Sequence, residues 1–253
     1  MVGGEPLLQA RIVERISNHA QEAMRNTSGR FDGSITTNGY LLTRGLATRL
    51  CKAGVTKYQI TLDGSKESHD KTRVLKGGGP SFDVIWKNLT ELKDSNLNFS
   101  IVLRLHVNSV NEMDYQEFVD HVQHTFSRDS RFSAHTKSIE NLGGVNGVDV
   151  PSFVPSSAHE ELNLDSFEAE NETVCYASMP NSMIIRANGR IAKCTVALND
   201  ERNDVGRLQR DGKIEFFSDR LKLWFHGYES QDPRALLCPL WGLPKLDNEI
   251  RGD

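Results

Sequence analysis

The first 139 residues alternate between segments with the two-residue period of a β-strand and segments with helical spacing. The clearest strand pattern spans residues 98–108, where apolar residues occupy every second position. Similar patterns span residues 34–38, 58–63 and 132–139, and helical patterns separate them. Strands that alternate with helices predict βαβ units and therefore a parallel sheet.

Each of the first three strand patterns has one polar face. A strand covered by helices on both faces normally has a continuous apolar sequence, which these strands lack. The polar positions are Thr36, Asn38, Thr61, Asp63, Arg104 and His106. We therefore expect an α/β fold built as a (β/α) barrel or partial barrel, with helices outside and a polar, ligand-holding mouth inside.

The stretch of residues 58–73 combines such a strand with a cluster of charges. Asp63 and a glycine end the strand, and a segment that we interpret as a charged loop follows it. That segment carries Glu67, His69, Asp70 and Arg73. The stretch is either an active-site strand of an α/β protein or an edge strand with a solvated loop.

Two further groups of residues on the predicted elements have more than one interpretation. Glu5, in the turn Gly3-Gly4-Glu5-Pro6, either binds an ammonium group or complements the dipole of a following helix. That helix is predicted by the helical spacing of Leu8, Ile12, Ile16 and Ala20. A buried Arg104 needs an anionic partner, either a neighbour such as Asp63 or a ligand carboxylate, and His106 alone is typical of a satisfied core histidine.

The composition favours a folded protein with no affinity for polyanions. The 253 residues are 38% hydrophobic and 25% charged, and the net charge is −4. The sequence contains no dominant basic block, so its charge gives no reason to expect binding to nucleic acid or to an anionic membrane. Since there is also no signal-peptide pattern and no apolar run of about 20 residues, we expect a cytoplasmic protein.

The second half of the chain has a different organisation. Residues 140–172 are polar and rich in Gly and Pro, which predicts a linker, whereas residues 182–187 and 190–197 predict two strands joined by an Asn-Gly hairpin turn. Three of the four cysteines follow the linker: Cys175, Cys194 and Cys238. They are either ligands of zinc or of an iron–sulfur cluster, which their concentration favours, or small buried hydrophobes.

Several blocks of the chain, in order, resemble radical S-adenosylmethionine enzymes. These blocks are GGEPLL at 3–8, ITTNGYLL at 35–42, ITLDGSKESHDKTR at 60–73 and the following GGGPSFDVIWKNLTELK. The most similar subgroup carries a SPASM or twitch C-terminal extension and includes sulfatase-maturating and peptide-modifying enzymes. The order Cys175, Gly189, Cys194 and the segment RALLCPLWGLP resemble that extension.

The resemblance implies a partial radical SAM barrel at residues 1–139, a linker at 140–172 and an iron–sulfur extension at 173–253. It implies that S-adenosylmethionine is bound by Gly3, Gly4, Glu5, Thr61, Arg73, Arg104 and Asn108. Asp63 would be the catalytic group that handles a proton or orients the substrate. Cys175, Cys194 and Cys238 would bind an auxiliary four-iron four-sulfur cluster.

The chain departs from the family pattern in two respects. The family's Cys-x3-Cys-x2-Cys loop, which binds the cofactor-cleaving cluster, is missing, as are the first barrel strands that would precede GGEP. In the extension, Ala235, Trp241 and Leu246 stand where cysteines are expected. We therefore expect an N-terminally truncated member that does not itself cleave the cofactor.

The expected parent enzyme would modify a peptide or protein substrate by radical chemistry and receive electrons from a flavodoxin or ferredoxin. Two alternatives are left open. One is a catalytically inactive scaffold that binds a peptide or protein partner, with zinc or no metal at the cysteines. The other is a barrel enzyme that uses Asp63, His69 and Arg104 in acid–base chemistry.

Overall fold

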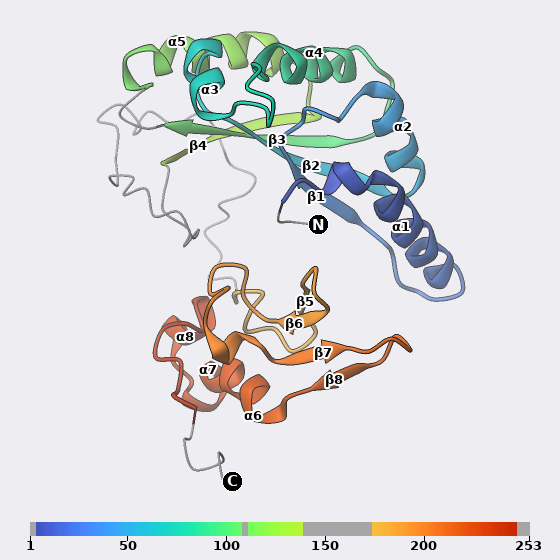
Figure 1. Cartoon of the computed structure of the whole chain (residues 1–253), viewed down its shortest axis with the longest axis vertical. Helices are drawn as coiled ribbons and strands as arrows, with labels where there is room; N and C mark the ends of the chain where they lie inside the picture. The colour runs from blue at the N-terminus through green and yellow to red at the C-terminus, as the bar shows by residue number, and fades with distance from the viewer. Residues whose placement is uncertain (1–3, 108–110, 139–173, 247–253) are drawn as a thin grey trace. The chain divides into compact units, whose positions relative to one another are not determined.

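The computed structural model describes residues 4–107, 111–138 and 174–246, which belong to two compact units (Figure 1). The described part of the N-terminal unit ends at residue 138, and that of the C-terminal unit begins at residue 174. The predicted linker lies outside the described residues, so the predicted domain boundaries stay predictions.

The N-terminal unit is built on a parallel sheet of four strands in the order β1-β2-β3-β4. The strands are β1 (Gly33–Thr37), β2 (Val55–Leu62), β3 (Ser100–Val107) and β4 (Phe132–Ser138). The helical segments are η1 (Pro6–Gln9), α1 (Ala10–Met24), α2 (Arg44–Lys52), α3 (Lys66–Thr72), α4 (Phe82–Lys93) and α5 (Glu112–Phe126). The predicted α/β class with a parallel sheet is confirmed, and within the described ranges the four strands form an open sheet in which β1 and β4 are not paired.

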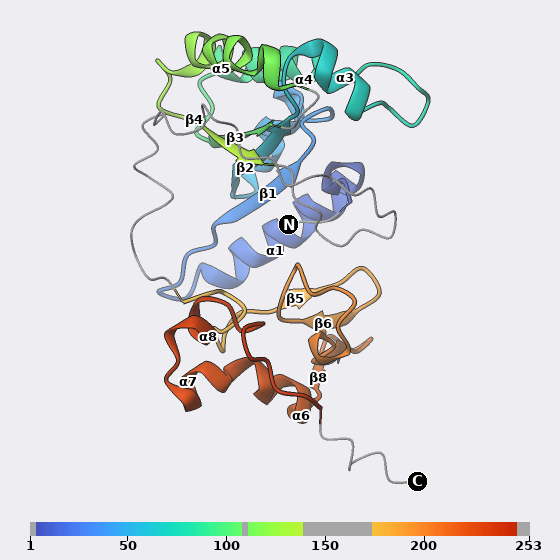
Figure 2. The ribbon, with the colours of Figure 1, turned by 90° about the vertical axis from the view of Figure 1, so that its left-hand side faces the viewer.

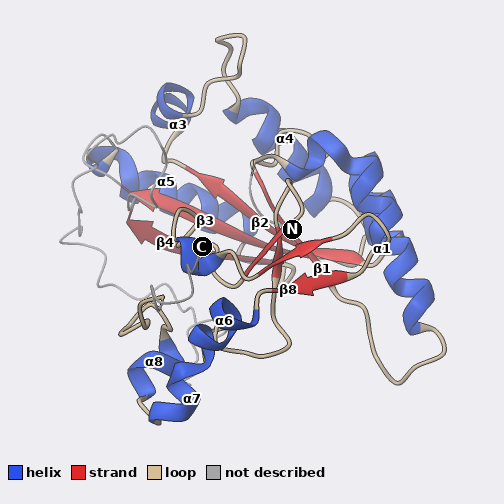
Figure 3. Ribbon diagram, turned by 60° about the horizontal axis from the view of Figure 1, so that its bottom comes forward, coloured by secondary structure: helices blue, strands red, loops and turns tan. Residues whose placement is uncertain are grey.

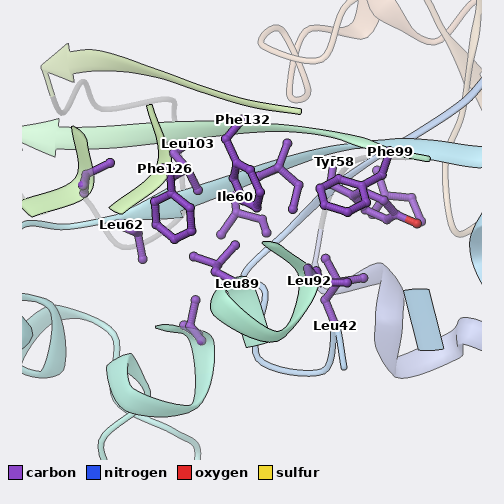
Figure 4. Packing of buried hydrophobic residues seen from close by; sticks show 14 of the residues in the cluster. Leu42, Tyr58, Ile60, Leu62, Leu89, Leu92, Phe99, Leu103, Phe126 and Phe132 are labelled. Atoms are coloured by element: carbon purple, nitrogen blue, oxygen red, sulfur yellow. The ribbon is translucent and has the colours of Figure 1, made fainter. Parts of the chain in front are cut away.

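One face of this sheet packs against helices and forms the core. Figure 2 shows α3, α4 and α5 together on this face. In Figure 4, Ile60 of β2 and Leu103 of β3 point toward Leu89 and Leu92 of α4, and all four side chains are at most 1% exposed. Because side chains alternate along a strand, the residues between these positions lie on the opposite face of the sheet.

The predicted N-terminal helix is present, but its predicted apolar row does not face the core. Leu8, Ile12 and Ile16 are 71%, 53% and 51% exposed, whereas Leu7 and Val13 are each 3% exposed. The chain first forms the 3₁₀ turn η1 and then α1, which lies beside β1 at the edge of the sheet (Figure 1). The spacing therefore predicted the helix correctly but not its buried side.

The C-terminal unit contains a small antiparallel sheet in the order β5-β6-β7-β8. Its strands are β5 (Ile184–Ile185), β6 (Arg190–Ala192), β7 (Gly206–Leu208) and β8 (Ile214–Phe216). Its helical segments, which Figure 3 shows in blue, are η2 (Glu201–Asn203), α6 (Ser218–Leu221), η3 (Lys222–Phe225), α7 (His226–Ser230) and α8 (Pro233–Leu237). The predicted hairpin is confirmed, with Gly189 at φ +78° in the turn, although both strands are shorter than predicted.

The longest helices, α1 and α5, have 15 residues each among those the structure describes. Over the described part of the chain, none combines the length and the apolar character that a membrane span requires.

Candidate functional site

The side of the parallel sheet that faces away from the core helices carries polar residues, and we call it the polar face. Its members are Thr36, Gln59, Thr61, Arg104, His106, His135 and Lys137. Thr61, Arg104 and His135 are direct neighbours across β2, β3 and β4, and His106 and Lys137 form the next pair toward the strand ends. The carboxyl ends of parallel strands are where α/β proteins bind their ligands.

Asp63 follows β2 and is the centre of a buried polar cluster. Its side chain is 7% exposed, and its Oδ2 accepts hydrogen bonds from Nε of Arg73 at 2.7 Å and from Oγ1 of Thr72 at 3.1 Å. Its Oδ1 lies 3.1 Å from Nδ1 of His106. Burial alone would raise the pKa of Asp63, but the His106 imidazole and the Arg73 guanidinium together lower it well below its ordinary value. Asp63 is therefore a carboxylate.

His69 holds the backbone of Asp63 through a hydrogen bond and is itself fully buried. Its Nδ1 accepts a hydrogen bond from the backbone N–H of Asp63 at 3.2 Å, and its Nε2 lies 3.2 Å from Oγ of Ser81. Since that hydroxyl donates its proton to the carbonyl of Arg73, the ring proton of His69 must be on Nε2. Burial lowers the pKa of His69 to about 4, and the nearby Arg73 charge acts in the same direction. The imidazole is thus a neutral structural bridge.

The segment after β2, interpreted from the sequence as a charged loop, is the helix α3, and this interpretation was wrong. Ser65 caps the helix by accepting a hydrogen bond from the backbone N–H of Ser68. Asp70 accepts hydrogen bonds from the backbone N–H groups of Ser81 and Phe82 at 2.8 and 2.9 Å, so it caps the start of α4. Glu67 is exposed and takes no part in the site. Most of these charges therefore build the local structure.

Glu5 lies at the same end of the sheet and ties the N-terminal turn to β1. Its carboxylate accepts hydrogen bonds from Oγ1 of Thr37 at 2.8 Å, from the backbone N–H of Asn38 at 2.8 Å and from that of Leu7 at 2.9 Å. Gly4, with φ +57°, forms the bend before it, whereas Gly3 and Asn108 lie outside the described residues. A carboxylate has room for about four acceptor contacts, so Glu5 keeps capacity for one more donor.

Arg104 does not pair with Asp63, because Asp63 is bound by Arg73 and contacted by His106 instead. The Arg104 side chain is half-buried, and it forms no hydrogen bond or ion pair with any residue in the described ranges. The sequence had not indicated His135 and Lys137 as members of the polar face. The alternation in β4 would have found them once its parity was known.

The three candidate metal-binding cysteines all lie in the C-terminal unit. Cys194 is buried, Cys175 is half-buried and Cys238 is exposed. Asn203 accepts hydrogen bonds from the backbone N–H groups of Lys193 and Cys194, both at 2.9 Å, and so fixes the turn after β6. No group of three His, Cys, Asp or Glu side chains within the described part of the chain is placed to hold a metal ion. As arranged here, the cysteines do not fit a cluster, and their assignment as ligands stays a prediction.

Comparisons with known proteins bear on the N-terminal unit first. Residues 1–122 match the model of the Radical SAM superfamily. Fe-coproporphyrin III synthase of Methanosarcina barkeri is 29% identical over 118 residues, which are 47% of this chain and 27% of that protein. An uncharacterized protein of Methanocaldococcus jannaschii is 31% identical over 99 residues, which are 39% of this chain and 33% of that protein. The matched part thus spans a third or less of these relatives.

Solved structures match over most of the chain. Polyhistidine-tagged anSMEcpe with bound AdoMet has a TM-score of 0.62 and 16% identity over 94% of this chain and 69% of that chain. Native anSMEcpe with bound AdoMet and the Cp18Cys peptide has a TM-score of 0.60 and 17% identity over 94% of this chain and 73% of that chain. At this identity the likeness concerns the fold. Residues 1–122 therefore match a radical SAM superfamily domain in sequence, and the parallel sheet of this unit agrees with that match.

Proposed function

We propose that the N-terminal unit binds S-adenosylmethionine on its polar face. The observation that carries this proposal is Arg104, a half-buried guanidinium without a protein partner in the described ranges, within a radical SAM superfamily domain. A desolvated arginine requires an anion, and a carboxylate matches its planar donors. The carboxylate of S-adenosylmethionine meets this requirement.

The other assignments follow the same chemistry. Glu5 would accept a hydrogen bond from the cofactor's ammonium group with its remaining acceptor capacity, and the flanking Gly3 and Gly4 would allow the backbone to approach it. Thr61 and Arg73 would lie near the ribose and the carboxylate, and Asn108 would line the pocket beside Arg104. When bound next to a reduced cluster, S-adenosylmethionine supplies a carbon-centred radical.

The proposed activity is the radical modification of a peptide or protein substrate. Its support is the fold likeness to anSMEcpe, which was solved with AdoMet and a peptide. None of the four cysteines of this chain has the spacing Cys-x3-Cys-x2-Cys, so its own residues would bind the cofactor without holding the cleaving cluster. A cytoplasmic location and a flavodoxin or ferredoxin as electron donor belong to the same proposal.

The proposal also includes an auxiliary four-iron four-sulfur cluster on Cys175, Cys194 and Cys238. Because these thiols do not fit a cluster as arranged here, binding would require their segments to rearrange. Anaerobic reconstitution followed by iron, sulfide and zinc analysis tests this part. We expect about one cluster per chain, lost on Cys194→Ser, whereas zinc or no metal would contradict it.

Calorimetric titration with S-adenosylmethionine tests the cofactor site. Loss of a hydrogen-bonded charge pair is worth about 1.5–3 kcal/mol, so Arg104→Met should weaken binding by roughly 10- to 100-fold. Arg49→Met is the matched control, because Arg49 pairs with Glu14 on the helical surface and is 58% exposed. Decarboxylated S-adenosylmethionine should bind the wild type and Arg104→Met with similar affinity.

Equal losses for both cofactor forms would show that Arg104 does not bind the carboxylate. If neither form binds the wild-type chain, the hypothesis of a non-catalytic scaffold is favoured. Heat of binding from a peptide partner alone would then support that alternative.

A further inference from the structure

Neither carboxylate oxygen of Asp63 is open to a ligand that would give up a proton. Its Oδ2 already accepts two hydrogen bonds, from Arg73 and Thr72. Its Oδ1 is fully buried, and its 3.1 Å contact with Nδ1 of His106 falls short of ideal hydrogen-bond geometry. Contacts of this kind often tighten when a ligand binds. The accessible group at this end of the sheet is therefore the neighbour of Asp63, not Asp63.

His106 presents one nitrogen to Asp63 and leaves the other available. A carboxylate accepts hydrogen bonds and cannot donate them, so the proton of neutral His106 belongs on Nδ1. Its Nε2 then carries a lone pair, and no hydrogen-bond partner of Nε2 lies among the described residues. The imidazole is 16% exposed, and His106 lies on the polar face two residues after Arg104, so their Cα atoms are about 7 Å apart along β3.

His69 shows that this arrangement is not a general property of histidines in this unit. Both nitrogens of His69 have partners, its proton is on Nε2, and its side chain is 0% exposed. Asp63 thus touches two histidines in opposite ways, with its backbone N–H toward His69 and its carboxylate toward His106.

We propose that His106 accepts a proton from an amine, hydroxyl or thiol of the molecule bound on the polar face, and that Asp63 is the positioning residue that fixes its tautomer. The ligand's X–H bond breaks, the proton bonds to Nε2 and the electron pair stays on X, so no oxidant or reductant is needed. Four charged groups lie around the His106 imidazole. They are Asp63, which follows β2, Arg73, which pairs with Asp63, Arg104 on β3, and Lys137, the register partner of His106 on β4. Of these groups, Asp63 contacts His106 directly, and its negative charge stabilises the imidazolium that forms when His106 accepts the proton.

This inference rests on the proposed function only in requiring a ligand on the polar face. Long-range ¹H–¹⁵N correlation spectra of the full chain at pH 8 test the tautomers, with signals assigned from His106→Gln and His69→Gln. We expect His106 protonated on Nδ1 and His69 protonated on Nε2. In Asp63→Asn, His106 should shift toward the Nε2–H tautomer of free imidazole, whereas His69 should keep its tautomer. An Nε2–H tautomer of His106 in the wild type would overturn the proposal.

A second measurement on the wild type does not depend on whether Asp63→Asn folds. Diethyl pyrocarbonate acylates the lone pair of a neutral imidazole, so the folded chain should be labelled at His106 through Nε2. The reagent can reach the fully buried His69 only when the structure around it opens transiently, so labelling of His69 should be at least about tenfold slower. Equal labelling rates would overturn the proposal. Titration with S-adenosylmethionine in the same preparation separates the two proposals, because failure to bind the cofactor leaves the tautomer and labelling results unaffected.

Discussion

Replacing His69 by glutamine should make the N-terminal unit less sensitive to mild acid. The imidazole is fully buried, and both of its nitrogens are engaged, Nδ1 as an acceptor from Asp63 and Nε2 next to Ser81. A second proton would have to occupy Nδ1, where it would face the backbone N–H of Asp63. Glutamine offers one acceptor and one donor group and carries no proton that titrates in this range.

The size of the effect follows from the two pKa values of His69. Burial lowers the pKa to about 4 in the folded chain, and an unfolded chain has about 6.5. Because the folded pKa is the lower one, the unfolded state binds more protons below pH 6.5, and acid favours unfolding. Linkage gives a loss of about 2 kcal/mol between pH 7.5 and pH 5, rising toward about 3.4 kcal/mol below pH 4.

Hydrogen exchange with mass spectrometry in graded urea measures this effect within one unit. Peptides from β2 and α4 report the free energy of unfolding of the N-terminal unit, independently of the C-terminal unit. The comparison uses the change from pH 7.5 to pH 5 in each protein, so any constant effect of the substitution cancels. We expect the wild type to lose about 2 kcal/mol more than His69→Gln over this interval. Asp63 adds nothing to the difference, because its lowered pKa places its contribution below pH 4.

Parallel loss of stability in the two proteins would refute the reasoning. It would mean that His69 is protonated as easily in the folded chain as in the unfolded one. The assigned hydrogen bonds to Asp63 and Ser81 would then be wrong as well.

Two further substitutions test the local structure, both by urea unfolding of the N-terminal unit. Asp70→Ala removes the carboxylate that caps α4 and should destabilise the unit by about 1–2 kcal/mol. Asp83→Ala is the matched control, because Asp83 also pairs with Lys66, the lysine that Asp70 contacts, but its side chain is 70% exposed. It should change stability by less than about 0.5 kcal/mol. Gly64→Ala forces alanine to φ +90° and places its Cβ 2.7 Å from Nδ2 of Asn111. It should be more destabilising than Gly78→Ala, which has φ +85° but open space around it and should cost about 1 kcal/mol. Equal effects within either pair would contradict the cap or the close approach.

The sequence predicted the elements better than their buried sides. The strands of the parallel sheet were predicted correctly because period-two alternation is a local property that burial of one face imposes on each strand. The helix α1 was also predicted, but its buried residues are Val13 and Ser17, which have the same four-residue spacing as the exposed Ile12 and Ile16. Which row is buried depends on contacts with other elements, and a local pattern does not contain that information.

The same distinction applies to the candidate site. The sequence placed Asp63, Arg104 and His106 on polar positions of neighbouring strands, and the register confirms that Arg104 is the neighbour of Thr61. It did not predict which cation Asp63 binds. Arg73 reaches Asp63 because the helix α3 turns the chain back after Gly64. We had interpreted this segment as a loop, and a loop does not predict where Arg73 lies, so the pair with Asp63 could not be predicted.

The pairing of Asp63 with Arg73 decides how the rest of the polar face must be understood. Since the carboxylate already balances one guanidinium, Arg104 is left without an anion in the described part of the chain although it is half-buried. A cation that is partly removed from water gains from an anionic partner, which a ligand can supply here. The same pairing keeps Asp63 ionised, which in turn fixes the orientation of His106. One structural ion pair therefore leaves Arg104 in need of an anion and directs Nε2 of His106 toward a proton donor, and a ligand that carries both a carboxylate and a protonated donor would satisfy both.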